Sequence, residues 1–156
     1  MISKSKENIM VYISSSILKI FESYKQYNRK DNESGGILLG QVLGNNIYIL
    51  KASPPNKFDK SSRYSFECNK DAAQIVIDYE FLNSEHKTIY LGEWHTHPED
   101  FPSPSWIDKG MIKNQYFKNK LNEPFLILII QGLKKLYVAL YNGSSIDRVE
   151  FTILDD

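Results

Sequence analysis

Apolar and polar positions change their period several times along the chain, and these changes predict alternating helices and strands. Apolar residues spaced by three and four indicate a helix, whereas strict alternation or a short continuous apolar run indicates a strand. Helices are expected at about residues 15–27, 71–82 and 105–118. Strands are expected at about residues 9–13, 36–43, 47–50, 87–97, 125–131, 135–141 and 146–154.

The segments between these elements complete the expected organisation. Gly44-Asn45-Asn46 is a turn signal that joins two strands into a hairpin. Residues 57–65 are polar and are expected to form a mobile loop, and residues 125–131 are so apolar that they indicate a central strand buried on both faces. No repeat or linker divides the chain. We therefore predict one α/β domain over residues 1–156, with a mixed β-sheet flanked by helices.

Composition narrows the classes of function. The 156 residues include 42% hydrophobic residues, enough for a sizeable core, and 19 basic against 19 acidic residues give a net charge of zero. Neither nucleic acid nor a membrane surface is expected as a partner, because no basic excess is present. Cys68 is the single cysteine, and residues 1–8 are polar without the apolar core of a signal peptide. A cytoplasmic protein is expected.

Candidate metal ligands follow the strand predicted at residues 87–97. His95 and His97 are two residues apart, so on a strand both imidazoles point the same way. Asp108 lies in the first turn of the next predicted helix and completes a possible set of three ligands that suits zinc. A His-x-His pair alone is equally consistent with structural histidines. Ser105 and Asp108 also fit a helix capping box, and the two readings do not exclude each other.

Hydrolysis at such a metal requires a general base, and two glutamates are candidates. Glu33 lies just before the buried strand predicted at residues 36–43. By composition alone, the polar segment around it is more typical of a loop in which the glutamate is solvated. Glu93 is the rival, because on a strand it shares a face with His95 and His97. Its alternative role is to support the ligands from outside the metal site.

The combined motif resembles a known family. Glu33 precedes a Gly-rich apolar segment that ends at Gly40, His95-Thr96-His97-Pro98 follows, and seven residues separate His97 from Ser105-Trp106-Ile107-Asp108. This arrangement resembles the JAMM metalloproteases, also called the JAB1/MPN/Mov34 family, over almost the whole chain.

The resemblance implies a role for each residue of the motif. His95, His97 and Asp108 are the expected ligands of one Zn²⁺ ion per chain. Glu33 is the expected base that deprotonates the attacking water and later protonates the leaving amine. Ser105 is expected to donate a hydrogen bond to the oxyanion. The implied fold is the MPN/JAB architecture, which is similar to that of cytidine deaminases.

The resemblance also implies a class of substrate. Many members cleave the isopeptide bond between the C-terminal tail of ubiquitin, or a ubiquitin-like protein, and a lysine. The segment from Leu91 to Pro98, the pair Pro104-Ser105 and the compact length resemble stand-alone bacterial members. The resemblance is greatest to the deconjugating peptidase of type II CBASS antiphage defence, whose substrate is a conjugated cGAS-like nucleotidyltransferase. A deconjugase of another bacterial ubiquitin-like pathway is one alternative. A non-catalytic MPN scaffold or tail-binding module is the other.

Overall fold

The computed structural model describes residues 8–156. The expectation that residues 1–8 lack the apolar core of a signal peptide concerns residues that, except for residue 8, lie outside this range. The helices are α1 (Ser15–Ser23), α2 (Lys70–Asn83) and α3 (Trp106–Lys118). The strands are β1 (Met10–Ser14), β2 (Gly35–Leu43), β3 (Asn46–Ala52), β4 (Lys60–Ser62), β5 (Ser65–Glu67), β6 (Ile89–Thr96), β7 (Leu126–Gln131), β8 (Leu136–Tyr141), β9 (Ile146–Arg148) and β10 (Phe151–Leu154).

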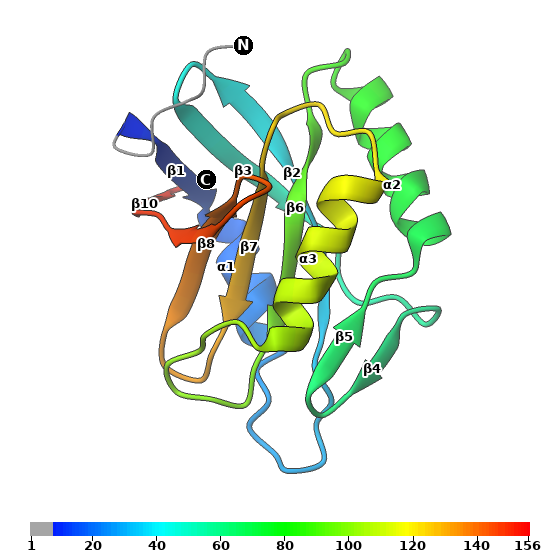
Figure 1. The fold of residues 1–156 in the computed structure, drawn as a ribbon, viewed down its shortest axis with the longest axis vertical. Helices are drawn as coiled ribbons and strands as arrows, with labels where there is room; N and C mark the ends of the chain where they lie inside the picture. Colours follow the sequence, from blue (N-terminus) through cyan, green and yellow to red (C-terminus); the bar gives the residue numbers. More distant parts are fainter. Residues whose placement is uncertain (1–7) are drawn as a thin grey trace.

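Eight of these strands form one curled, mixed sheet in the order β10-β1-β3-β2-β6-β7-β8-β9 (Figure 1). β1 runs parallel to β3 and β10, β6 runs parallel to β7, and the other neighbours are antiparallel. The expectation of an α/β fold with a mixed sheet flanked by helices is confirmed.

The curl of the sheet brings its two ends together. β9 and β10 occupy opposite ends of the strand order, yet only Val149 and Glu150 separate them in the sequence. The Val149 amide donates to the Val138 carbonyl of β8, and the Glu150 carbonyl accepts from the Val11 amide of β1. Two adjacent residues therefore connect both margins of the sheet.

Each face of the sheet has its own apolar core. α1 packs on one face, where Ile17 and Phe21 join buried strand residues that include Trp94 and Ile127. α2 and α3 cover the other face, where Ile112 of α3 meets Leu128 and other residues of β7 and β8 (Figure 1). β7 is buried along its whole length and contributes to both cores, as its continuous apolar run predicts.

Three expectations about local structure were wrong. α1 ends at Ser23 rather than near residue 27, because the chain leaves the helix to bring the side chain of Gln26 into buried hydrogen bonds. Residues 57–65 are not wholly a loop, since they include β4 and the start of β5, which form a separate two-stranded sheet. The strand expected at residues 146–154 is two strands, β9 and β10, which pair at opposite ends of the large sheet.

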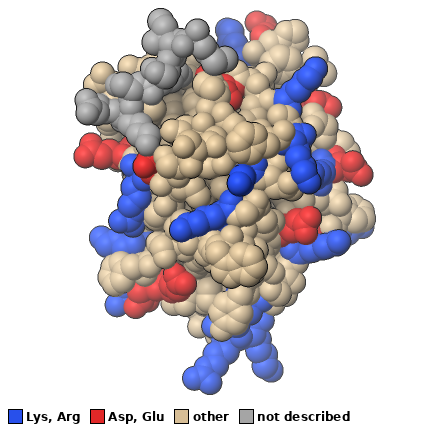
Figure 2. Space-filling model, viewed as in Figure 1, with Lys and Arg blue, Asp and Glu red and all other residues tan. Residues whose placement is uncertain are grey.

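Two surface properties complete the description. Among the described residues, no helix is long and apolar enough to cross a bilayer. On the face shown in Figure 2, acidic and basic side chains are interspersed, and neither sign forms a continuous area.

Candidate metal centre

The two histidines lie at the end of β6, in the middle of the sheet. β6 pairs with β2 on one side and β7 on the other, so its backbone is fixed from both directions. Gly92 allows this close pairing, because a Cβ atom there would collide with the Ile127 carbonyl oxygen. His97 follows the last residue of β6, and its amide donates to the Gln131 carbonyl at 3.0 Å. Both imidazoles are buried and aim into one site.

Asp108 reaches this site from the first turn of α3. The Ser105 hydroxyl accepts a hydrogen bond from the Asp108 amide at 3.1 Å, and the Ser105 amide donates to Asp108 Oδ2 at 2.9 Å. The predicted capping box is therefore present and fixes the Asp108 carboxylate. Ser105 Oγ makes no donating hydrogen bond to another described residue, so its hydroxyl hydrogen is available.

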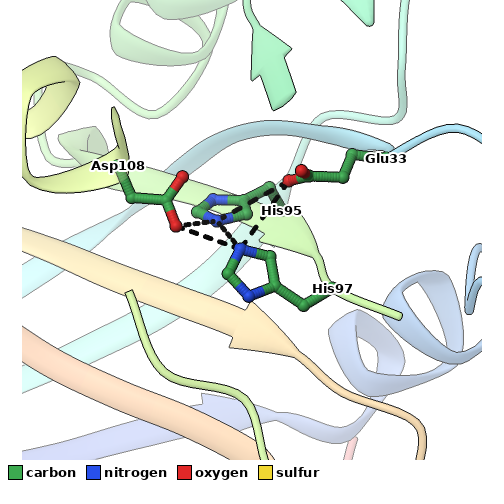
Figure 3. Close-up of side chains that lie close together, drawn as sticks. All are labelled: Glu33, His95, His97 and Asp108. Carbon is green, nitrogen blue, oxygen red and sulfur yellow. Dashed lines mark hydrogen bonds and ion pairs between the residues drawn. The ribbon is translucent and has the colours of Figure 1, made fainter. Parts of the chain in front are cut away.

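Three potential ligand atoms form a nearly equilateral triangle (Figure 3). His95 Nε2 and His97 Nε2 lie 3.1 Å apart, and Asp108 Oδ2 lies 3.2 Å and 3.0 Å from them, respectively. If both nitrogens carried hydrogen and donated to the one oxygen, the two N–H groups would be crowded side by side. A cation that takes one lone pair from each atom removes this conflict.

Glu33 approaches the imidazoles from the side opposite Asp108 (Figure 3). Its Oε1 atom lies 4.0 Å from His95 Nε2 and 3.8 Å from His97 Nε2, farther out than the ligand triangle. Glu33 is only 2% exposed, and Oε1 is buried without a hydrogen-bond partner among the described residues. A buried carboxylate oxygen without a partner is costly, so its presence here indicates a use in binding or chemistry.

A network of backbone and side-chain contacts fixes the segment that carries Glu33. The Glu33 amide donates to the Ser62 carbonyl of β4 at 2.7 Å. Thr96 Oγ1 accepts from the Ser34 amide and donates to Gln26 Oε1, while Gln26 Nε2 donates to the carbonyls of Asp31 and Arg63. Sequence reasoning missed Gln26, Thr96 and Ser62, because no motif marks a residue that acts through such long-range contacts.

The electrostatics of the site follow from burial and from the closeness of its groups. Burial raises the pKa of Glu33 to about 8, with Asp108 and Glu99 adding to the increase and His97 opposing it. Burial opposes ionisation of Asp108, but hydrogen bonds from His95 and His97 lower its pKa well below the ordinary value. Burial likewise opposes protonation of His97, yet Asp108, Glu33 and Glu99 raise the pKa of its imidazole above the ordinary value.

The donor set fits a divalent metal ion. Four buried residues, Glu33, His95, His97 and Asp108, have ligand atoms within 4.8 Å of one another. Tetrahedral zinc with bonds of about 2.0–2.1 Å requires ligand atoms roughly 3.3 Å apart, close to the 3.0–3.2 Å edges of the triangle. Two neutral imidazoles and one carboxylate are a donor set that suits zinc.

Other residues near the motif take different positions. Trp94 is buried against Phe21, with its indole N–H donating to the Ser53 carbonyl, so it is a core residue. Trp106 is 82% exposed beside Ser105. Glu93 shares the face of His95, as expected, but lies in a pocket beneath α2 and is absent from the four-residue cluster.

Comparison with known proteins identifies the family. The model of prokaryotic homologues of the JAB domain matches residues 22–142. The chain belongs to the prokaryotic JAB family. The matched residues include Glu33, both histidines, Ser105 and Asp108, so every position of the expected JAMM motif lies inside this JAB domain.

Individual relatives agree with this assignment. The chain is 36% identical over 135 residues to a protein of Pseudomonas aeruginosa described as a CD-NTase/cGAS isopeptidase, covering 86% of this chain and 85% of the relative. A protein of Escherichia coli with the same description is 37% identical over 129 residues, covering 83% and 80%. The solution structure of protein DSY2949 from Desulfitobacterium hafniense has a TM-score of 0.68 at 19% identity and 94% coverage of both chains, which shows that this JAB protein shares its fold.

Proposed function

We propose that this JAB protein is a zinc-dependent isopeptidase that hydrolyses the bond between a protein's C-terminal tail and a target amine. The observation that carries the proposal is the triangle of His95, His97 and Asp108 with the unpartnered Glu33 oxygen beside it. The isopeptidase names of the relatives support the class of bond, and the family supports peptidase chemistry.

His95, His97 and Asp108 would hold the ion, and each has a structural reason to stay in place. β6 is paired on both sides and fixes the histidines, while the capping box fixes Asp108. Zinc in such a site acidifies water and polarises a carbonyl group. Asp108 would remain ionised over the whole working range of pH, because its pKa is strongly lowered.

Glu33 and Ser105 would perform the proton transfer and the charge stabilisation. Glu33 Oε1 accepts a proton from the attacking water, whose oxygen bonds to the carbonyl carbon. The same carboxyl group then gives that proton to the amine nitrogen as the C–N bond breaks, leaving a carboxylate and a free amine. The Ser105 hydroxyl, which has its hydrogen available, donates to the carbonyl oxygen as negative charge develops there.

The β4–β5 hairpin offers a place for an extended tail. A two-stranded sheet leaves one edge of each strand unpaired, and an extended peptide can add to such an edge through backbone hydrogen bonds. Because the hairpin also holds the Glu33 amide, a tail on its edge would lie beside the site. The proposed substrate is a ubiquitin-like protein or a conjugated cGAS-like nucleotidyltransferase in antiphage defence, since the relatives are described as isopeptidases of CD-NTase or cGAS.

The test offers the zinc-loaded protein a fusion in which a short peptide follows the C-terminus of a cGAS-like nucleotidyltransferase. We expect cleavage at the junction, a loss of at least a hundredfold in Glu33→Gln, and unchanged zinc content by mass spectrometry. Glu22→Gln, an exposed glutamate of α1, is the control. Full cleavage by Glu33→Gln would overturn the mechanism. A protein that takes up no zinc and cleaves nothing would instead support the scaffold alternative. A parallel fusion to a bacterial ubiquitin-like protein distinguishes the two substrate classes.

A further inference from the structure

A pocket of about 410 Å³ lies between α2 and α3, over the N-terminal part of β6. Its apolar lining comes from β2, α2, β6 and the segment after α3, and includes Ile37, Ile77, Ile89 and Leu121. The volume lies within the range of small-ligand pockets. The metal-centre residues do not line this pocket.

Glu93 gives this pocket, whose lining is part apolar and part polar, a carboxylate. It points to the same face of β6 as His95, two residues away, so a strand rise of about 3.3 Å per residue places it about 7 Å from that ligand. Among the described residues its only hydrogen-bond partner is the Tyr90 hydroxyl, at the long distance of 3.5 Å. It forms no ion pair with a described residue. The carboxylate therefore has unused acceptor capacity directed into the pocket.

The four charged residues of the pocket differ in their exposure to solvent. Lys70, Asp78 and Lys120 also line it, but all three are exposed, so their charges are largely solvated. Glu93 is partly buried and is the least exposed charged residue of this lining, and its carboxylate accepts only the long hydrogen bond from Tyr90 among the described residues. A guest with a long aliphatic stem and a terminal cation would match both the apolar walls and this carboxylate.

The pocket also lies on the expected path of the substrate. Cys68, which lines it, follows the end of β5 by one residue, and the metal ligands stand at the far end of β6. The pocket therefore adjoins the hairpin, and a tail that runs along the hairpin toward Glu33 has this pocket beside it. We propose that Glu93 is a specificity-determining residue that binds a basic side chain of the substrate tail, above all arginine. This inference rests on the proposed function, because the tail is that of the proposed substrate.

The first test measures binding without cleavage, so that it does not depend on catalysis. The probes are N-acetyl-arginine N-methylamide and its neutral isostere, the citrulline derivative, titrated into the zinc-loaded, ¹⁵N-labelled protein. We expect saturable shifts of the Tyr90 and Glu93 amides, with at least fivefold weaker binding of the citrulline probe. Glu93→Gln should abolish this preference, whereas Asp71→Asn removes a charge from the exposed first turn of α2 and should retain it.

Each result of this test decides the proposal. Equal affinity for the two probes, no binding of either, or a preference that survives in Glu93→Gln would overturn it. The comparison of the two probes on the parent protein stands even if Glu93→Gln folds poorly. Failure to cleave any fusion, with the arginine preference intact, would instead contradict only the proposed function.

A second test connects the pocket to the tail. Fusions that carry arginine, citrulline or leucine at each of the last six positions before the junction are compared by KM and kcat. We expect one position at which arginine lowers KM at least fivefold with little change in kcat, and at which Glu93→Gln removes the difference. If the arginine probe binds but no position shows this effect, the pocket takes a free cation and the assignment to the tail is wrong.

Discussion

The backbone amide of Glu33 donates a 2.7 Å hydrogen bond to the carbonyl of Ser62, so the β4–β5 hairpin holds the proposed general base. The ring of Phe66 in β5 anchors this hairpin, because it lies over Gly35 so closely that a Cβ atom there would approach it to 2.7 Å. The hairpin thus links the proposed binding edge to the base.

Phe66→Ala should lower kcat more than it lowers metal binding. The variant loosens the hairpin and with it the position of Glu33, while the ligands on β6 and α3 keep their own supports. We expect about a tenfold loss of kcat, equivalent to about 1.4 kcal/mol, with zinc content unchanged. Phe58→Ala, at a ring that is 61% exposed, is the matched control. Loss of zinc together with activity would contradict this separation of roles.

Zinc affinity should rise with pH. In the metal-free protein the pKa of His97 is raised above its ordinary value, so below that pKa a proton occupies the imidazole that the metal needs. As pH falls through this range, the apparent affinity should fall by about tenfold per unit for one displaced proton. Competition titrations between pH 5.5 and 8, with calorimetry in buffers of different ionisation enthalpy, measure this. An apparent zinc affinity that does not change with pH would refute the prediction. The control variant His86→Gln, at an exposed histidine, should show the same pH dependence as the parent protein.

Ser105 variants should separate capping from catalysis. Ser105→Ala removes the cap and should cost about 1 kcal/mol of unfolding free energy, whereas Ser105→Gly should cost only a few tenths. Both lose the hydroxyl hydrogen, so both should lower kcat by about 10²–10³. Thermal unfolding and steady-state kinetics give the two quantities. If activity instead followed stability, so that Ser105→Gly were nearly fully active, Ser105 would be only a cap.

The buried pair of Gln26 and Thr96 should contribute strongly to stability. Thr96→Val leaves the Ser34 amide and Gln26 Oε1 without their partner, which should lower the unfolding free energy by about 1–3 kcal/mol. Adding Gln26→Leu should cost less than the sum of the two single changes, because both act on one network. Denaturant unfolding of the parent protein, the two single variants and the double variant measures these free energies. Thr152→Val, at an exposed threonine, is the control. Additive effects would show that the two side chains act independently.

Periodic apolar positions allowed most of the fold to be predicted, since β2, β6, β7 and β8 have buried faces that impose a pattern. β4 could not be predicted, because its three residues are all exposed and so show no apolar alternation. It is a strand only through its pairing with β5. The cluster of His95, His97 and Asp108 could be predicted, because side chains that converge on one ion from a strand end and a helix start need fixed spacings, and the structure brings the three together. Their role as metal ligands stays a prediction. Glu33 was predictable only through its resemblance to a family motif, and Gln26 carries no signal in the sequence.

The joining of β9 and β10 by Val149 and Glu150 has a consequence for synthesis on the ribosome. β1 emerges early, yet one of its two parallel partners is β10, with Val11 opposite Phe151. β1 therefore stays without this partner until β10, Phe151–Leu154 of the 156 residues, has been synthesised. Such long-range pairing slows folding and leaves the edge of β1 exposed to other nascent chains.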